Sequence, residues 1–190
     1  MATSSEMPAG AVFNRYKASF LMRSTDPGTL RTVDIWTFKS SKSNKRYIVE
    51  VEHFNNHFFG LKFYWKGVAS SKNRYSLLTN DFEPRTIIMS CIDIMIRYFT
   101  HDKCASFGFV AAEDLFKATD KSRPNKRFRF YRRMMLSLFK PETFLQVNDT
   151  KKSIYLLVNQ IMIKDGAINL KQIEAEISRL YEGEYRLESI

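Results

Sequence analysis

The stretch RYIVEVEHFNNHFFGLKFYW, residues 46–65, limits the fold more than any other part of the chain. In both of its halves apolar residues alternate with polar or small ones, which is the period of two of a half-buried β-strand. Asn55 and Asn56 separate the halves, and Asn tolerates the positive φ that a tight turn requires. The sequence therefore predicts an antiparallel hairpin, with Glu50 and Glu52 as surface charges on its solvent face.

The remaining elements follow from the same periodicity argument. Pro84 suits the first position of a helix, and Asn169 with Gln172 forms the pattern of a capping box before another. A polar loop, 39–46, is expected between two of the early strands. The predicted strands are Phe13–Met22, Arg31–Phe38, the two halves of the hairpin, Ala105–Ala112, 143–147 and 153–158; the predicted helices run from Pro84 to His101, from Asn125 to Phe139 and from Leu170 to Tyr181.

Size and composition place these elements in a single domain. The chain has 190 residues, 44% of them hydrophobic, which suffices for one well-filled core. We predict an α+β fold over residues 12–190, preceded by a disordered tail at 1–11. Its sheet is mixed but mainly antiparallel, with two helices packed on it and a third helix at the C-terminus.

The order of elements from residue 84 to residue 158 resembles the C-terminal half of the GNAT N-acetyltransferase fold. In that family a helix precedes an apolar strand, and an Asn-containing loop then leads into a helix that ends in a Tyr, followed by two closing strands. Here ASFGFVAA is similar to the strand, Asn125 to the loop residue, and FRFYRRMM to the second helix, with TFLQV and SIYLLV as the closing strands. Tyr131 follows Asn125 by six residues, whereas the family has a spacing of seven.

The sequence lacks the loop with which GNAT enzymes hold the acyl-CoA pyrophosphate. That loop, of the type [Q/R]-x-x-G-x-[G/A], brings backbone N–H groups and a helix N-terminus up to the phosphates. The corresponding stretch, LLTNDFEPRTII, contains no glycine and carries Asp81 and Glu83, whose charges would repel a diphosphate. The resemblance therefore implies the fold without ordinary acyl-CoA binding, and no catalytic residue is assigned from it.

No cofactor or metal site is predicted. His53 and His57 lie on a strand and its turn, where a spacing of four keeps two ligands apart, and the two cysteines do not form a disulfide framework. We expect Cys91, within an apolar run, to be a small core residue. The N-terminus carries no secretory signal and no window is apolar enough for a membrane span, so we expect a cytoplasmic protein with no membrane partner.

Residues 121–133, KSRPNKRFRFYRR, carry most of the excess positive charge. Seven of these thirteen residues are basic and none is acidic, and without them the net charge of +10 would fall to +3. Such a concentration of cations indicates an anionic partner. Lys121 and Arg123 precede the predicted helix start, where free backbone N–H groups also favour an anion.

A helical projection separates the residues of the following helix into two faces. Lys126, Arg129 and Arg133 fall on the side that faces solvent, with Arg132 near its border. Arg127 falls among the apolar residues that should face the sheet, so it must find a carboxylate or carbonyl groups, or reach into a cavity. The predicted inward residues are Phe128, Tyr131, Met134, Met135, Leu138 and Phe139.

Two other surfaces offer weaker candidates. Phe58 and Tyr64, with lysines beside them, could stack on the bases of a single strand of nucleic acid. Glu113 and Asp114 follow an apolar strand, a place where active sites often lie. The structural readings are favoured for both, since most of the hairpin aromatics belong to its inward face and the two acids can pair with the basic helix that follows.

Three functional hypotheses remain. The first is a non-catalytic module that binds an anionic partner, nucleic acid first and an acidic protein surface second, through Lys121, Arg123, Lys126, Arg127, Arg129, Arg132 and Arg133. The second is a divergent acyltransferase that holds its acyl-CoA donor at Lys121–Lys126. The third is a subunit of a larger assembly, with the aromatic hairpin or the C-terminal helix as the contact.

Overall fold

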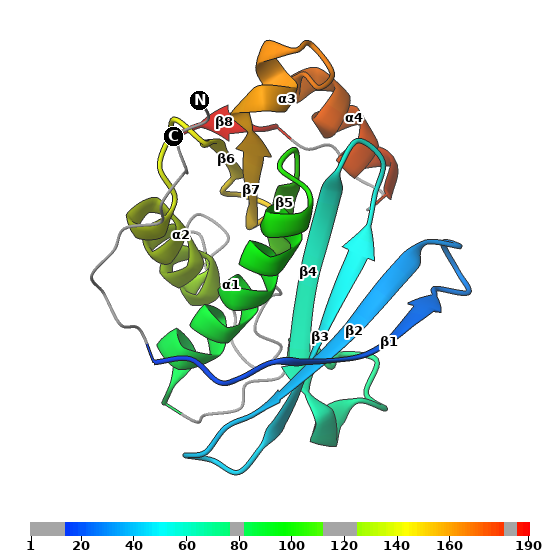
Figure 1. Ribbon diagram of the computed structural model, residues 1–190, viewed down its shortest axis with the longest axis vertical. Coiled ribbons are helices and arrows are strands. Elements are labelled where there is room, and N and C mark those ends of the chain that lie inside the picture. The colour runs from blue at the N-terminus through cyan, green and yellow to red at the C-terminus, as the bar shows by residue number, and fades with distance from the viewer. Residues whose placement is uncertain (1–13, 77–81, 112–124, 181–185) are drawn as a thin grey trace.

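The computed structural model describes residues 14–76, 82–111, 125–180 and 186–190, and these form an eight-stranded mixed sheet with helices (Figure 1). The strand order is β1-β2-β3-β4-β5-β7-β6-β8, and every neighbouring pair is antiparallel except β4 and β5. The predicted α+β fold with a mainly antiparallel sheet is therefore confirmed. The tail expected at 1–11 lies outside the described residues.

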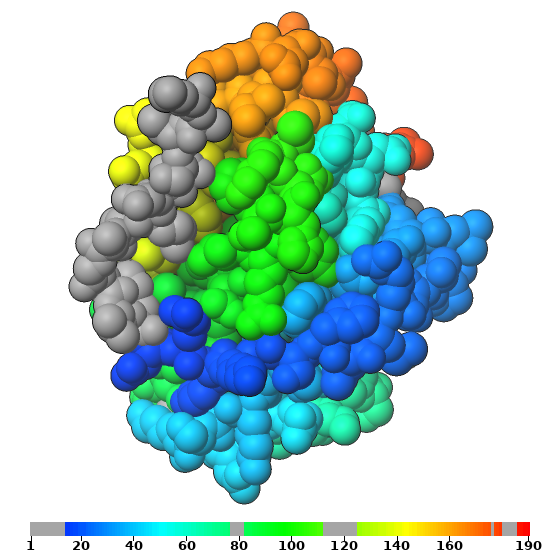
Figure 2. All heavy atoms as spheres, in the orientation of Figure 1, coloured from blue at the N-terminus to red at the C-terminus, as the bar shows by residue number. Residues whose placement is uncertain are grey.

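The strands have the following bounds: β1 Ser19–Thr25, β2 Thr32–Lys39, β3 Arg46–His53, β4 Phe58–Trp65, β5 Ser106–Val110, β6 Phe144–Asp149, β7 Ile154–Asn159 and β8 Glu188–Ser189. The hairpin of β3 and β4 is confirmed, and its turn holds Asn56 and His57 at positive φ. β1 begins later than the predicted residue 13, because the preceding segment crosses α1 instead of joining the sheet. There the Tyr16 N–H donates to Ser90 Oγ at 2.8 Å, and Figure 2 shows this segment in blue across the green helix.

The helices have the following bounds: α1 Pro84–His101, α2 Lys126–Leu138, α3 Gln160–Lys164 and α4 Leu170–Leu180, with a short 3₁₀ turn, η1, at Lys66–Val68. α1 and α2 cover one face of the sheet, while α3 and α4 pack on the other. The side chains of β7 show this division, since Tyr155 and Leu157 belong to the core beneath α1 and α2, whereas Ile154 and Leu156 belong to the core beneath α4.

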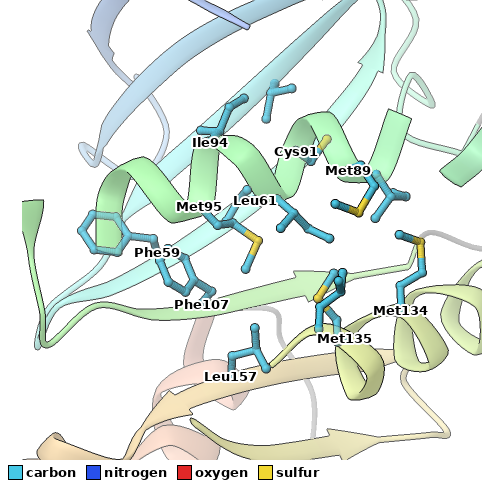
Figure 3. Close-up of a cluster of buried hydrophobic side chains, with 14 of the residues drawn as sticks. Phe59, Leu61, Met89, Cys91, Ile94, Met95, Phe107, Met134, Met135 and Leu157 are labelled. Atoms are coloured by element: carbon cyan, nitrogen blue, oxygen red, sulfur yellow. The ribbon is translucent and has the colours of Figure 1, made fainter. Parts of the chain in front are cut away.

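The larger core lies between α1, α2 and the middle strands. Figure 3 shows Met95 of α1 and Met135 of α2 close to Leu61, Phe107 and Leu157 of the sheet. The inward residues predicted for α2 all take part in this core: five of the six are buried, and Tyr131 is partly buried against them. The sequence pattern of the helix is thus confirmed by its packing.

The predicted helix starts are also confirmed. Pro84 is the first residue of α1, and the Asn125 side chain caps α2 by accepting a hydrogen bond from the Phe128 N–H at 2.7 Å. At α4 the Asn169 and Gln172 side chains each accept a hydrogen bond from the other's backbone N–H, at 2.9 and 3.1 Å. This reciprocal pair is the capping box that the sequence indicates.

The expectation that Glu50 and Glu52 are surface charges is wrong. Glu52 is only 8% exposed and accepts a hydrogen bond from Lys62 at 2.6 Å. Glu50 is half-buried and accepts a hydrogen bond from the hydroxyl of Tyr75. The segment 66–76 folds back over this face of the hairpin, and strand alternation alone cannot reveal such a cover.

Candidate functional site

The outer face of α2 carries three exposed cations on one side of the helix, Lys126, Arg129 and Arg133. Arg132, at the border of this face, is half-buried. No carboxylate among the described residues forms an ion pair with any of the three, whereas Arg15, Arg23, Arg74 and Arg97 elsewhere do have acidic partners. We call these three residues the basic face. Lys121 and Arg123, also predicted for the site, lie outside the described residues.

Arg127 has a different position from the other cations of the helix. Its Nη1 donates to the Tyr75 carbonyl oxygen at 2.7 Å and its Nη2 donates to the Ser76 carbonyl oxygen at 2.8 Å. The planar guanidinium therefore clamps the segment over the hairpin to α2. Of the outcomes expected for an arginine on the inward side, the structure shows hydrogen bonds to carbonyls.

Asn125 anchors the first turn of α2 to the sheet. While its Oδ1 caps the helix, its Nδ2 donates to the Ala111 carbonyl oxygen at 2.9 Å and to Ser153 Oγ at 3.1 Å. Ala111 directly follows β5, and Ser153 directly precedes β7. The orientation of the basic face is thus set by tethers at residues 125 and 127, one to the sheet and one to the outer segment.

The sheet forks directly beneath this helix. β4 and β5 pair in parallel only from Phe58–Gly60 to Ser106–Gly108, although β4 continues to Trp65 and β5 to Val110. The Ser106 N–H donates to the His57 carbonyl oxygen, so the carbonyl of residue 57 points toward β5. Residues an even number of positions along the same strand direct their backbone groups to the same side. The N–H and C=O groups of Leu61 and Phe63 therefore also point toward β5. Beyond Gly60, β4 has no strand partner on this side among the described residues.

A cavity of about 740 Å³ fills the fork, which we call the fork cavity. Its walls are mainly apolar and aromatic, with α1 on one side and α2 on the other. Tyr131, the counterpart of the Tyr in the acetyltransferase resemblance, lies in this wall, and burial raises the pKa of its phenol. The lining includes Phe63, Trp65, Phe82, Lys126, Arg127 and Phe130.

The N-terminus of α1, where an acyl-CoA pyrophosphate would be expected, holds a carboxylate of the chain itself. Glu83 is the N-cap residue and is buried. Its carboxylate accepts hydrogen bonds from the hydroxyls of Tyr16 and Ser40, both at 2.5 Å, and of Ser43 at 3.2 Å. These hydroxyls satisfy the carboxylate with no cation among the described residues, so an acidic side chain occupies this helix start.

An acidic network that we did not predict lies between β2, β3 and α1. Asp34 accepts hydrogen bonds from Arg23 Nε at 2.6 Å and from the Tyr98 hydroxyl at 2.6 Å, and lies 2.9 Å from His53 Nε2. Burial opposes ionisation of Asp34, but these partners outweigh it and lower its pKa to about 2. The available signal was an acid at an inward position of β2, two residues before Trp36.

The remaining candidates have structural partners or fall outside the described residues. His57 Nδ1 lies 2.7 Å from Asp102 Oδ2, and the described residues contain no group of three or more ligands that could hold a metal ion. The rings of Phe58 and Tyr64 are half-buried against Phe54 and Tyr75, with centroids 6.2 and 5.5 Å apart. Glu113 and Asp114 are not among the described residues.

Comparisons of the chain with protein-family models, curated proteins and solved structures find no match. Within the described ranges, none of the helices has the length and apolar character needed to cross a membrane.

Proposed function

We propose that the protein is a non-catalytic module that binds nucleic acid through the basic face of α2. The observation that carries this proposal is the group of three exposed cations, Lys126, Arg129 and Arg133, without acidic partners among the described residues. They project from a helix that is anchored at its N-terminal end, so their spacing is set before a partner binds. Cations held in this way contact successive phosphates along a nucleic-acid backbone.

The predicted binding depends steeply on salt, since each phosphate contact releases counterions. Three contacts give a slope of log K against log salt of about −2.7 on duplex DNA and about −2.1 on single strands. Fluorescence anisotropy with labelled 20-nucleotide single-stranded and duplex probes measures both slopes. The absorbance ratio at 260 and 280 nm, before and after a high-salt wash, shows whether nucleic acid co-purifies.

Paired variants separate the basic face from net charge. The double substitution Arg129→Glu and Arg133→Glu should abolish binding while the melting temperature stays close to that of the parent, because both side chains are exposed. The matched control is Lys164→Glu with Lys171→Glu, which changes net charge equally on exposed residues of α3 and α4. Equal loss of binding in both double variants, or binding indifferent to salt, would refute the proposal. Tight binding to polyglutamate without binding to nucleic acid would assign the face to an acidic protein instead.

We also propose a fold of the GNAT type for this chain. In support, α1, β5, α2 with Asn125 at its start, β6 and β7 follow one another in the order of the resemblance. The segment before α1 has no glycine, and Glu83 places a carboxylate at the helix start. These two features favour a module that has the fold but not the acyl-CoA site.

A further inference from the structure

The charged side chains that line the fork cavity differ in whether they have a partner of opposite charge. Three cations and one acid contribute to its lining: Lys62, Lys126, Arg127 and Glu83. Lys62 is paired with Glu52, and Glu83 is satisfied by hydroxyl groups. Positive charge without a carboxylate partner among the described residues therefore remains at one end of the cavity, where α2 begins.

The rest of the cavity is apolar and large enough for an organic molecule. Its volume of about 740 Å³ lies within the range of roughly 300–1,000 Å³ that is typical of small-molecule sites. Trp65 of β4 and Phe130 of α2 contribute aromatic rings to the lining. Such walls favour an apolar or aromatic body, which gains free energy by leaving water.

Phe82 provides a second, independent indication at the mouth of the cavity. Its ring is 88% exposed although it lines the cavity, and its φ of +52° lies in the left-handed region. A residue with a Cβ is disfavoured in that conformation, because the Cβ crowds the neighbouring carbonyl oxygen. An exposed ring held in a strained backbone is stabilised when a ligand in the cavity covers it.

We propose that the fork cavity binds a small amphipathic anion, with an apolar or aromatic body between β4, α1 and α2 and a single anionic group beside Lys126 and Arg127. Lys126 can contact the anion without leaving its helix position, and Arg127 has N–H groups in addition to the two that bind carbonyls. This site does not depend on the proposed nucleic-acid binding. Its anionic end lies at the start of α2 and not at the start of α1.

Two fluorescent probes of nearly identical shape test the proposal. 8-Anilinonaphthalene-1-sulfonate carries one sulfonate, and N-phenyl-1-naphthylamine is the same ring system without it. We expect both to bind the native protein, the sulfonate more tightly. Lys126→Gln should weaken the sulfonate about fivefold, as the loss of an ion pair worth about 1 kcal/mol implies, and leave the uncharged probe unchanged.

Matched variants and competitors complete the experiment. Arg133→Gln, on the same helix but outside the cavity lining, should affect neither probe. Phe63→Trp, which adds volume to the lining, should weaken both, and a rise in melting temperature with each probe shows that the folded state binds it. Dodecanoate should displace the sulfonate, since it shares an apolar body and one anion.

Three results would overturn the proposal. Equal effects of the substitutions at Lys126 and Arg133 would place the sulfonate on the surface of the helix. Probes that lower the melting temperature would be binding unfolded chains. Displacement by millimolar acetyl-CoA, but not by dodecanoate, would assign the cavity to a CoA thioester.

Discussion

Replacing Asp34 with Asn removes the negative charge at the centre of a buried network while keeping the shape of the side chain. Its carboxylate is 3% exposed and accepts hydrogen bonds from Arg23 and Tyr98 beside His53. The pKa of Asp34 in the folded protein is about 2, against roughly 3.9 in an unfolded chain. Because the folded pKa is the lower one, the ionised carboxylate stabilises the fold above pH 4, and this stabilisation is lost as the pH falls toward 2.

The magnitude follows from the difference in pKa. Nearly two units correspond to roughly 2–3 kcal/mol of unfolding free energy at neutral pH, and about half of this remains at pH 3. Asp34→Asn should therefore destabilise the protein by roughly 2–3 kcal/mol at pH 7 and by about half as much at pH 3. For a chain of this size the change at pH 7 lowers the melting temperature by about 4–12 °C.

Urea denaturation of both proteins at pH 7 and pH 3 measures this difference directly. Taking the parent minus the variant cancels the other carboxylates, which titrate in both. Asp93→Asn is the control, because Asp93 pairs with Arg15 and Arg97 nearer to solvent, where such pairs contribute about 0–1 kcal/mol. A stability difference for Asp34→Asn that is the same at both pH values would show that ionisation is not what the network stabilises.

Three further outcomes are expected. Arg127→Lys should lower the unfolding free energy by about 2 kcal/mol and speed proteolysis of segment 66–76, since one ammonium cannot reproduce the guanidinium's bonds to two carbonyls. An unchanged melting temperature and an unchanged cleavage rate would contradict the role of Arg127 as a clamp. Burial raises the pKa of the Cys91 thiol, so Ellman's reagent should modify half-buried Cys104 first and Cys91 only on unfolding. Simultaneous reaction of both thiols would be inconsistent with the burial of Cys91 in the core beneath α1. If Lys126 serves both sites, a saturating sulfonate probe should reduce the salt slope of nucleic-acid binding by about 0.9, whereas an unchanged slope would show that the two sites do not share it.

Local structure was largely predictable because it depends on neighbours in the chain. Pro84, Asn125, and the pair Asn169 and Gln172 start helices wherever they occur in a suitable pattern, since the free N–H groups they serve belong to the same turn. The division of α2 into a buried and a basic side follows equally from 3.6 residues per turn. For this reason the exposure of Lys126, Arg129 and Arg133 was predicted correctly.

Long-range features were not predictable from these patterns. Alternation in β3 assigns Glu50 and Glu52 to one face, but it does not show that Tyr75 of the returning segment binds Glu50 or that Lys62 of β4 binds Glu52. In the same way, the sequence of β4 does not show that its pairing with β5 ends at Gly60.

The sequence by itself therefore determined most of the elements, their order, the buried and basic sides of α2, and the place where positive charge accumulates. Only the tertiary structure decided that Arg127 clamps an outer segment, that Asp34 organises a buried network, and that a cavity opens under the basic helix. The physical reason is the separation along the chain between the residues that interact. Periodicity and capping act over a few residues, whereas a buried charge or a cavity is defined by partners that only folding brings together.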